Sequence, residues 1–307
     1  MNSTWNRSSI QRKKCPELGD TAMAQSTTTA AHPGPALNGR QLRLWQDLLE
    51  KRTGVQVVRR QENGIRTQIV RRMAEAGWTD ADYYFRSLDT ASGAREWGVL
   101  LDRLLVKETR FFRHQPSHEF VRQRIASLAS DLESPLWLWS AGCASGEEAY
   151  SLAVDAAEGF ARARREGNYY VVATDISKDA LAKARRAVYP GAEPSNLPAF
   201  LGRYFYSHGP NQVAVDESLK QRVAFYAQNL LDKDNRYLNQ MDVIYCQNVL
   251  IYFKAWRRRE LINYFRDCLK PGGCLVIGPG EIADWQPPQM VRLDVPGVQV
   301  YQKRSQP

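Results

Sequence analysis

The sequence predicts an α/β protein with a mainly parallel sheet and a small antiparallel β insert, preceded by an all-helical N-terminal domain. Residues 37–115 carry apolar side chains at helical spacing and show no strand pattern, which indicates the helical domain. From residue 116 onward, short apolar runs alternate with helical patterns, as in β-α-β units. At about residues 200–226 this alternation stops and turn residues gather, which indicates the insert.

The N-terminal part is divided into a leader and four helices. Residues 1–36 are rich in Ser, Thr, Ala and Pro, and we expect a disordered leader there. Gly54 is expected to end the first helix, because glycine readily takes the left-handed conformation that closes a helix. Thr79 is expected to cap the third helix. The helices are expected around Leu42–Leu49, Arg60–Ala76, Tyr83–Leu88 and Trp97–Leu105.

The second domain, residues 116–307, consists of short apolar runs between helical segments. Strands are expected at Leu136–Ser140, Tyr169–Ala173, Met241–Cys246, Cys274–Gly278, Gln289–Leu293 and Gln299–Gln302, and helices at Ala149–Phe160, Lys178–Arg186 and Ala255–Leu269. Three short antiparallel strands are expected in the insert, at Tyr204–Tyr206, Gln212–Val215 and Arg222–Tyr226.

Composition narrows the class of protein. The net charge of +9 favours an acidic partner such as nucleic acid, anionic lipid or an acidic protein surface. The five cysteines include no CxxC pair, and His114 and His118 have no obvious third ligand, so no metal site is predicted. The chain has no apolar run of the ~18 residues that span a membrane, and no secretory signal. The expected location is the cytoplasm.

A turn of small residues after the first strand of the second domain marks a candidate site. Ala141 and Gly142 follow the strand, and Glu147 and Glu148 open the next helix. Small residues let a ligand approach the backbone, whereas two carboxylates would repel a pyrophosphate and suit the cationic sulfonium and amine of S-adenosylmethionine. The dinucleotide fingerprint GxGxxG is absent. The alternative is a tight turn whose acidic residues serve only the helix dipole.

Two later strand ends supply further candidates. Asp175 stands where an acidic residue binds ribose hydroxyls in dinucleotide folds, although it could equally cap the next helix. Gln247 and Asn248 follow a strand on the far side of the expected crevice and offer polar contacts to a cofactor. Tyr252 either faces the reacting groups or belongs to the core.

Six motifs in order resemble one protein family over residues 37–303. The motifs are Thr109–Arg113, Ser140–Ala153, Ala173–Ile176, Asn229–Leu230, Asn248–Phe253 and Lys270–Gly273. Together they resemble the CheR family of chemoreceptor glutamate methyltransferases. The resemblance implies a Rossmann-like S-adenosylmethionine-dependent methyltransferase domain with a β insert, behind a helical N-terminal domain.

The resemblance also implies the residues of the site, with Arg113 and Tyr252 nearest the reacting groups. The residues expected to bind the cofactor are Thr109, Arg113, Ala141, Gly142, Glu147, Asp175, Asn229, Leu230, Gln247 and Asn248. The chain departs from the family pattern at Gln247, where the family usually has Arg, and this removes a guanidinium charge from one cofactor contact. It also has Lys107 where Asn is common, and Gly280 where Ser is usual.

A carboxylate substrate fits these residues. A glutamate with a reference pKa of about 4.3 is already ionised at neutral pH, so methyl transfer to it needs no general base. No His or Asp stands out in the sequence as a base, which fits a carboxylate better than a hydroxyl or an amine. Arg113 is expected to hold one carboxylate oxygen, and Tyr252 to donate a hydrogen bond or to line the sulfonium with its ring.

The segment 59–72 is a candidate docking surface, with five arginines and one glutamate. The resemblance implies that it faces the acidic, cytoplasmic methylation region of methyl-accepting chemotaxis-type receptors. The docking residues would be Arg59, Arg60, Arg66, Arg71 and Arg72. A solvated arginine face is the alternative, and Gln61 and Glu62 replace positions that are commonly basic in the family. We expect the protein to be a monomer that does not act on nucleic acid. The alternative functions are an RNA or DNA methyltransferase and a non-catalytic adaptor.

Overall fold

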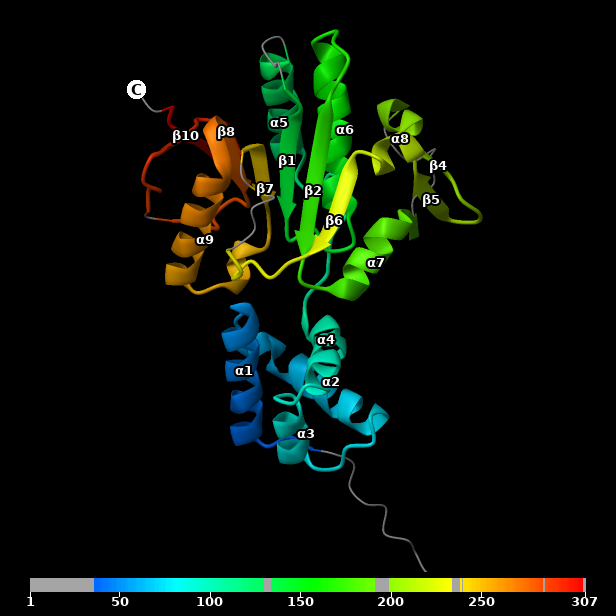
Figure 1. Ribbon diagram of the computed structural model, residues 1–307, viewed down its shortest axis with the longest axis vertical. Helices are drawn as coiled ribbons and strands as arrows, with labels where there is room; N and C mark the ends of the chain where they lie inside the picture. Colours follow the sequence, from blue (N-terminus) through cyan, green and yellow to red (C-terminus); the bar gives the residue numbers. More distant parts are fainter. Residues whose placement is uncertain are drawn as a thin grey trace, which may run out of the picture. The chain divides into compact units, whose positions relative to one another are not determined.

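The structure is a computed structural model that describes residues 36–129, 134–190, 199–233, 238, 240–283 and 285–305. Residues 1–35 of the expected leader lie outside the described residues. Figure 1 shows the helical N-terminal region and the sheet that follows it in the chain. Among the described residues, no helix combines the length and the apolar character needed to cross a membrane.

The described N-terminal region consists of helices that share one apolar core. They are α1 (Gly39–Thr53), the 3-10 turn η1 (Arg59–Gln61), α2 (Glu62–Glu75), α3 (Ala81–Ser87) and α4 (Gly93–Leu104). Trp45, Met73, Tyr84 and Leu100, one from each α-helix, are buried together in this core. The apolar spacing in the sequence therefore located these helices correctly.

The helix ends follow ordinary capping chemistry. Gly54 ends α1 with a φ of 76°, and its N–H donates to the Glu50 carbonyl at 2.7 Å. The prediction that Thr79 caps the third helix is wrong. The Asp80 carboxylate, directly before α3, accepts from the N–H groups of Asp82 and Tyr83 at 2.8 and 3.0 Å. Thr79 stands one position too early to reach both amides.

Seven strands form the main sheet in the order β6-β2-β1-β7-β8-β10-β9. Their bounds are β1 (Leu136–Ala141), β2 (Tyr169–Asp175), β6 (Val223–Ala227), β7 (Met241–Cys246), β8 (Leu269–Ile277), β9 (Met290–Arg292) and β10 (Gln299–Lys303). The strands from β6 to β8 run parallel, and β10 runs antiparallel to both of its neighbours. The carboxyl ends of β1, β2 and β7 therefore meet at one edge.

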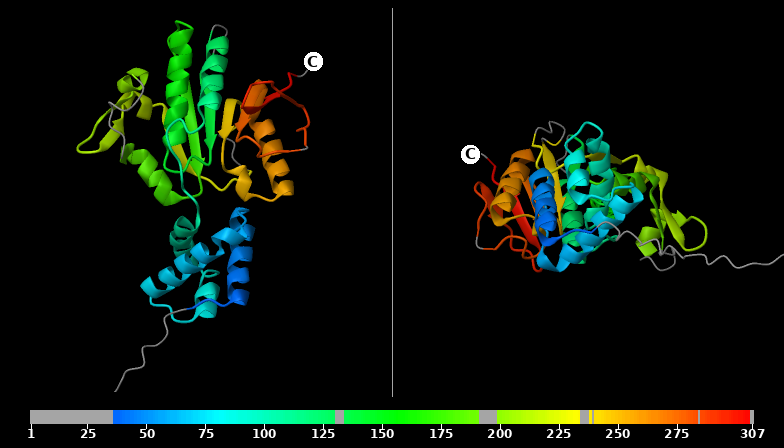
Figure 2. Two further views of the ribbon diagram at one scale, coloured as in Figure 1. Left: turned by 180° about the vertical axis from the view of Figure 1, so that it is seen from behind. Right: turned by 90° about the horizontal axis from the view of Figure 1, so that it is seen from below.

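Helices cover both faces of this sheet. They are α5 (Gln115–Leu128), α6 (Glu147–Arg162), α7 (Lys178–Arg186) and α9 (Ala255–Cys268). Consecutive residues of β1 enter different cores: Leu138 packs with Leu152 of α6, and Trp139 packs with Phe265 of α9. Seen from behind, α5 and α6 lie over the strands (Figure 2). The sequence did not predict α5, which packs along α6.

The insert differs from the prediction in one strand. It is a three-stranded antiparallel sheet in the order β3-β5-β4, made of β3 (Val188–Pro190), β4 (Phe205–Ser207) and β5 (Gln212–Val215). The interpretation of Arg222–Tyr226 as its third strand, within an insert of about 200–226, is wrong. The helix α8 (Glu217–Lys220) carries the chain back to the main sheet, where β6 pairs parallel with β2.

Candidate active site

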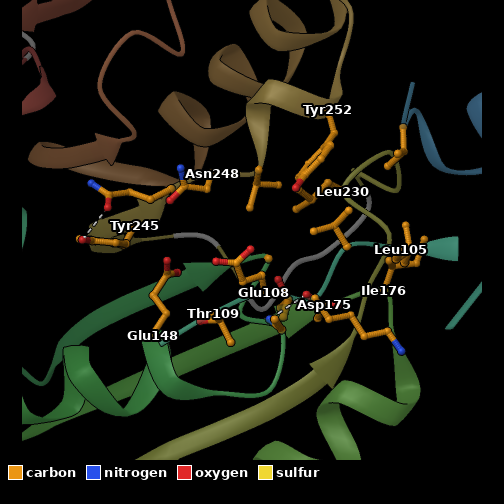
Figure 3. A pocket seen from close by; sticks show the side chains of 18 of the residues that line it. Leu105, Glu108, Thr109, Glu148, Asp175, Ile176, Leu230, Tyr245, Asn248 and Tyr252 are labelled. Atoms are coloured by element: carbon orange, nitrogen blue, oxygen red, sulfur yellow. Dashed lines mark hydrogen bonds between the residues drawn. The ribbon is translucent and has the colours of Figure 1, made fainter. Parts of the chain in front are cut away.

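A cavity lies at the carboxyl ends of β1, β2 and β7, where open α/β sheets bind ligands (Figure 3). Its empty volume is about 1140 Å³, which includes the part open to solvent. We call the lining residues that follow these strands the strand wall; they include Gly142, Glu148, Asp175 and Asn248. We call the lining residues of the segment 105–113, between α4 and α5, the linker wall. Thr53, the last residue of α1, and Val55, which follows the helix, also line the cavity.

The turn after β1 needs glycine where it approaches the cavity. Gly142 has a φ of 88°, and a Cβ added there would lie 2.6 Å from Cγ2 of Val249. No L side chain fits this conformation and space without strain. Gly142 and its neighbour Ala144 both line the cavity, so a ligand can approach the backbone closely. The sequence-based interpretation of a close-approach turn is consistent with this geometry.

Asp175 ends β2 and points into the turn after β1. Its Oδ2 accepts from the Ala144 N–H and its Oδ1 from the Ser177 N–H, both at 2.8 Å. Burial raises the pKa of this carboxyl, and the two backbone hydrogen bonds oppose the shift. Ser177 is the residue that caps α7, because its side chain accepts from Ala180. The alternative role of Asp175 as the helix cap is therefore wrong, and its carboxylate lines the cavity.

The glutamate that lines the cavity is Glu148 and not Glu147. Glu148 Oε1 accepts from Ser140 Oγ at 2.6 Å, and burial raises the pKa of the Glu148 carboxyl to about 8. Glu147 Oε2 accepts instead from Ser145 Oγ at 2.7 Å. Consecutive helix residues point about 100° apart, so only one of the pair faces the cavity. Ala141 does not line the cavity either, because its side chain is buried in the core on the α9 side.

The other expected cofactor residues lie on the cavity. They are Thr109, Arg113, Gly142, Asp175, Asn229, Leu230, Gln247 and Asn248. Asn229 also joins the two regions of the chain, since its Nδ2 donates to the Arg52 carbonyl at 2.7 Å. Leu105, Ile176 and Leu230 lie on the same side of the cavity as Asp175 (Figure 3). This apolar group suits the faces of a purine.

Tyr252 and Arg113 both line the cavity. Tyr252 lies at the end of η5 (Leu250–Tyr252), and its carbonyl accepts from the Gln56 N–H of the helical region at 2.7 Å. Burial raises the pKa of its hydroxyl, while the charges of Arg113 and, more weakly, Arg60 lower it. Tyr252 is therefore a partly exposed cavity residue beside two cations, and not an enclosed core residue.

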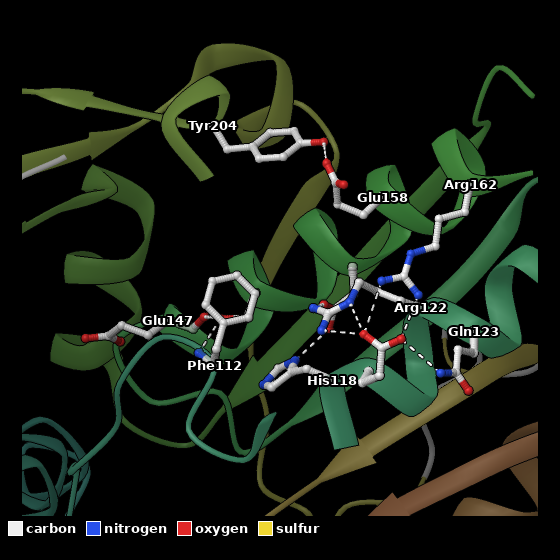
Figure 4. Close-up of polar contacts among 11 residues, drawn as sticks. Phe112, His118, Arg122, Gln123, Glu147, Glu158, Arg162 and Tyr204 are labelled. Carbon is white, nitrogen blue, oxygen red and sulfur yellow. Dashed lines mark hydrogen bonds and ion pairs between the residues drawn. The ribbon is translucent and has the colours of Figure 1, made fainter. Parts of the chain in front are cut away.

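The sequence did not reveal a buried histidine–carboxylate pair on the cavity. His118 lines the cavity, and its Nδ1 lies 2.5 Å from Oδ2 of Asp155. Arg122 donates to the other Asp155 oxygen at 2.7 Å (Figure 4). The sequence analysis named no histidine as a lining residue of the site. The only available signal was the spacing of His114 and His118, which we considered for metal binding alone; His114 instead caps α5.

Three of the five expected docking arginines have partners within the protein. Arg72 forms two hydrogen bonds with the Glu96 carboxylate, at 2.7 and 2.6 Å. Arg71 pairs with Glu75 at 3.1 Å, and Arg66 donates to the Leu37 carbonyl. The exposed Arg59 and Arg60 lie in η1. Arg66 and Arg72 of α2 are therefore partly buried, whereas Arg71 of α2 is exposed like Arg59 and Arg60 of η1.

The strand wall carries carboxylates suited to a cationic cofactor, on a fold whose ligands bind at the strand ends. These features define an S-adenosylmethionine-dependent methyltransferase. Residues 107–293 match the family model described as "CheR methyltransferase, SAM binding domain". The chain belongs to the CheR methyltransferase family, and its cofactor is S-adenosylmethionine.

Three relatives illustrate the match. The chemotaxis protein methyltransferase of Escherichia coli (strain K12) is 33% identical over 250 residues, covering 80% of this chain and 85% of that protein. Chemotaxis protein methyltransferase 1 of Pseudomonas aeruginosa is 31% identical, covering 83% of this chain and 95% of that protein. The chemotaxis protein methyltransferase of Borreliella burgdorferi is 32% identical, covering 67% and 75% respectively.

Proposed function

We propose that this enzyme methylates glutamate side chains in the cytoplasmic methylation region of methyl-accepting chemotaxis-type receptors, as a monomer in the cytoplasm. The observation that carries the proposal is that Arg113 and Tyr252 line the same cavity, where the charge of Arg113 acts on the Tyr252 hydroxyl. A cation and a hydroxyl placed there suit an anionic substrate group. The names of the relatives, all chemotaxis protein methyltransferases, support receptors as the substrates.

The residues present fit the cofactor. Glu148 suits its ammonium, and Asp175 suits its ribose hydroxyls, because a carboxylate accepts from both kinds of donor. Leu105, Ile176 and Leu230 suit its purine. The close-approach turn at Gly142 leaves room that a Cβ would fill. When bound, S-adenosylmethionine supplies a methyl group on a positively charged sulfur, which a nucleophile attacks in line.

The protein's own residues would then align and shield the substrate carboxylate. Arg113 would hold one oxygen through its guanidinium, which leaves the other oxygen to attack. Tyr252 would donate a hydrogen bond or line the sulfonium with its ring. Such positioning is worth up to about 7–11 kcal/mol of the reaction barrier when the geometry is near that of attack.

The docking surface on the enzyme would be centred on η1. Arg59 and Arg60 are exposed, and the charge of Arg60 reaches the Tyr252 hydroxyl. An acidic receptor helix held there would bring its glutamate toward Arg113. Arg66, Arg71 and Arg72 would contribute less, because they already bind Leu37, Glu75 and Glu96. Attraction at exposed arginines is screened by salt, so docking would weaken at high ionic strength.

The experiment is methyl transfer from tritiated S-adenosylmethionine to a receptor cytoplasmic fragment, with RNA and DNA in parallel reactions. We expect label only in the receptor fragment, released as volatile methanol by mild base, because a carboxyl methyl ester hydrolyses there. A receptor fragment with its methylated glutamates changed to alanine is the matched control. Base-stable label, or label in nucleic acid, would contradict the proposal. No label in any sample would favour a non-catalytic adaptor.

A further inference from the structure

One end of the cavity is formed by Glu148, Tyr245, Gln247 and His118. Figure 3 shows Glu148 and Tyr245 on the side of the cavity away from Asp175. With the ribose at Asp175, this end would receive the amino-acid group of the cofactor. That group carries an ammonium, which suits Glu148, and a carboxylate, which needs a separate hydrogen-bond donor.

Gln247 does not supply this donor, because its amide is committed within the protein. Its Nε2 donates to Ser117 Oγ at 2.7 Å and to the Ile277 carbonyl at 3.3 Å. Its Oε1 accepts from the Tyr245 hydroxyl at 3.0 Å. A primary amide has two N–H donors, and here both have partners. The Tyr245 hydroxyl hydrogen is used in the same network.

His118 has an uncommitted ring edge at this end. Its ring packs between Phe112 and Tyr245, with centroid distances of 5.2 and 5.3 Å. Asp155 is held by the Arg122 guanidinium and acts as an acceptor, so the His118 Nδ1 carries the hydrogen that it shares with Asp155 (Figure 4). Among the described residues, none forms a hydrogen bond with His118 Nε2.

We propose that His118, oriented by Asp155, binds the carboxylate of the cofactor's amino-acid group through Nε2. An imidazolium has an N–H at each ring nitrogen, so one donates to Asp155 while the other donates to the ligand. The proposal rests on the proposed position of the cofactor, but not on the identity of the receptor.

The charges around His118 come from each element packed against it. Asp155 and Glu148 lie on α6, and Arg122 and His114 lie on α5. Tyr245 of β7 stacks on the ring and stays neutral, since burial raises the pKa of its hydroxyl well above its usual value. Burial and the neighbouring His118 lower the pKa of His114, whose Nδ1 accepts from the Ser117 N–H. Of these groups, Asp155 is the one in hydrogen-bond contact with the His118 ring.

Three ligands isolate this contact. Decarboxylated S-adenosylmethionine differs from S-adenosylmethionine only in lacking the carboxylate, and 5′-methylthioadenosine lacks the whole amino-acid group. Isothermal titration calorimetry on the full-length enzyme gives the dissociation constant of each. If the wild-type enzyme binds none of them, the proposed cofactor site fails. If it binds them, the variants below test His118 alone.

The substitution His118→Gln removes the ring edge and keeps an amide that can donate to Asp155. We expect its affinity for S-adenosylmethionine to fall about tenfold to hundredfold, the range of a hydrogen bond to a charged group. Its affinities for the other two ligands should stay unchanged. Asp155→Asn should cause a smaller loss, again confined to S-adenosylmethionine. His208→Gln, at an exposed site away from the cavity, is the matched control.

An equal loss of affinity for all three ligands would mean that His118 only packs, and an unchanged affinity for S-adenosylmethionine would place the carboxylate elsewhere.

Discussion

The strand wall and the linker wall of the cavity carry opposite charges. The strand wall holds two carboxylates, Glu148 and Asp175, both with pKa values raised by burial. The linker wall holds three cationic residues, Lys107, Arg110 and Arg113, and a single acidic residue. A methyl donor that is a cation and a methyl acceptor that is an anion need such a division. This division agrees with the proposal that the cationic methyl donor lies against Glu148 and Asp175 and that the anionic acceptor lies near Arg113.

The largest expected effect is on the linker wall, at Arg113. Arg113→Ala should lower receptor methylation at saturating cofactor by about 100-fold or more, because a charged donor that aligns the reacting carboxylate is lost. Arg113→Lys should retain part of the activity, since a lysine keeps the charge without the planar fork. Initial rates of base-labile methyl incorporation measure both. If both variants kept rates near that of the wild-type enzyme, another residue would hold the substrate carboxylate.

On the strand wall, Asp175→Asn should weaken cofactor binding. The amide keeps the size of the side chain but loses the charge that accepts from hydroxyl groups, so we expect affinity for S-adenosylhomocysteine to fall about tenfold to hundredfold. Calorimetry measures this change. Asp179→Asn, at an exposed position on α7, is the control. An unaffected affinity in Asp175→Asn would place the ribose elsewhere.

The neighbouring glutamates allow a matched test of which one faces the cofactor. Glu148→Gln should lower affinity for S-adenosylmethionine, whereas Glu147→Gln should leave it unchanged, because only Glu148 lines the cavity. The raised pKa of Glu148, about 8, also affects stability without ligand. The contribution of this group is fully present below about pH 4.5 and is lost progressively as pH rises to about 8, because over this range the unfolded state releases the proton that the folded state retains.

Thermal unfolding of the ligand-free enzyme measures this effect. The difference in melting temperature between Glu148→Gln and wild type should shift in favour of the variant as pH rises toward 8, while Glu147→Gln should show a smaller shift. The opposite order for the two variants would show that Glu147, and not Glu148, is the carboxylate whose pKa burial raises more.

The smallest expected effects concern the docking arginines. Arg60→Ala should raise KM for the receptor fragment by about twofold to fivefold at low salt, as for an exposed charge pair. This increase should shrink as salt is added. Arg71→Ala, in the same basic segment but paired with Glu75, should change KM less. Steady-state kinetics at two salt concentrations compares them, and equal effects would show that the whole segment docks.

Much of the fold could be predicted from local patterns. The apolar spacing located α1, α2, α6 and α9, and apolar runs located β1, β2 and β7. The sequence could not show which sheet Arg222–Tyr226 joins. Five residues that favour a β-strand can pair equally well in the main sheet or in the insert. The pairing of β6 with β2 depends on where α8 returns the chain.

The candidate site was predicted at the level of segments. The turn after β1 and the ends of β2 and β7 do line the cavity. The sequence could not show which of Glu147 and Glu148 points inward, because that depends on the rotation of α6 against the sheet. It could not show the His118–Asp155 pair either, because these residues are 37 positions apart and meet only where α5 packs on α6.

By itself, the sequence determined the helices and strands, the glycine turn and the order of motifs that identifies a CheR-type methyltransferase, because these depend on neighbouring residues. The tertiary structure alone decided which carboxylate lines the cavity, which arginines have partners within the protein and where a histidine meets a buried aspartate. These features depend on the distances and burial created when separate elements pack together. The strand wall and the linker wall, set apart by charge, exist only in the folded chain.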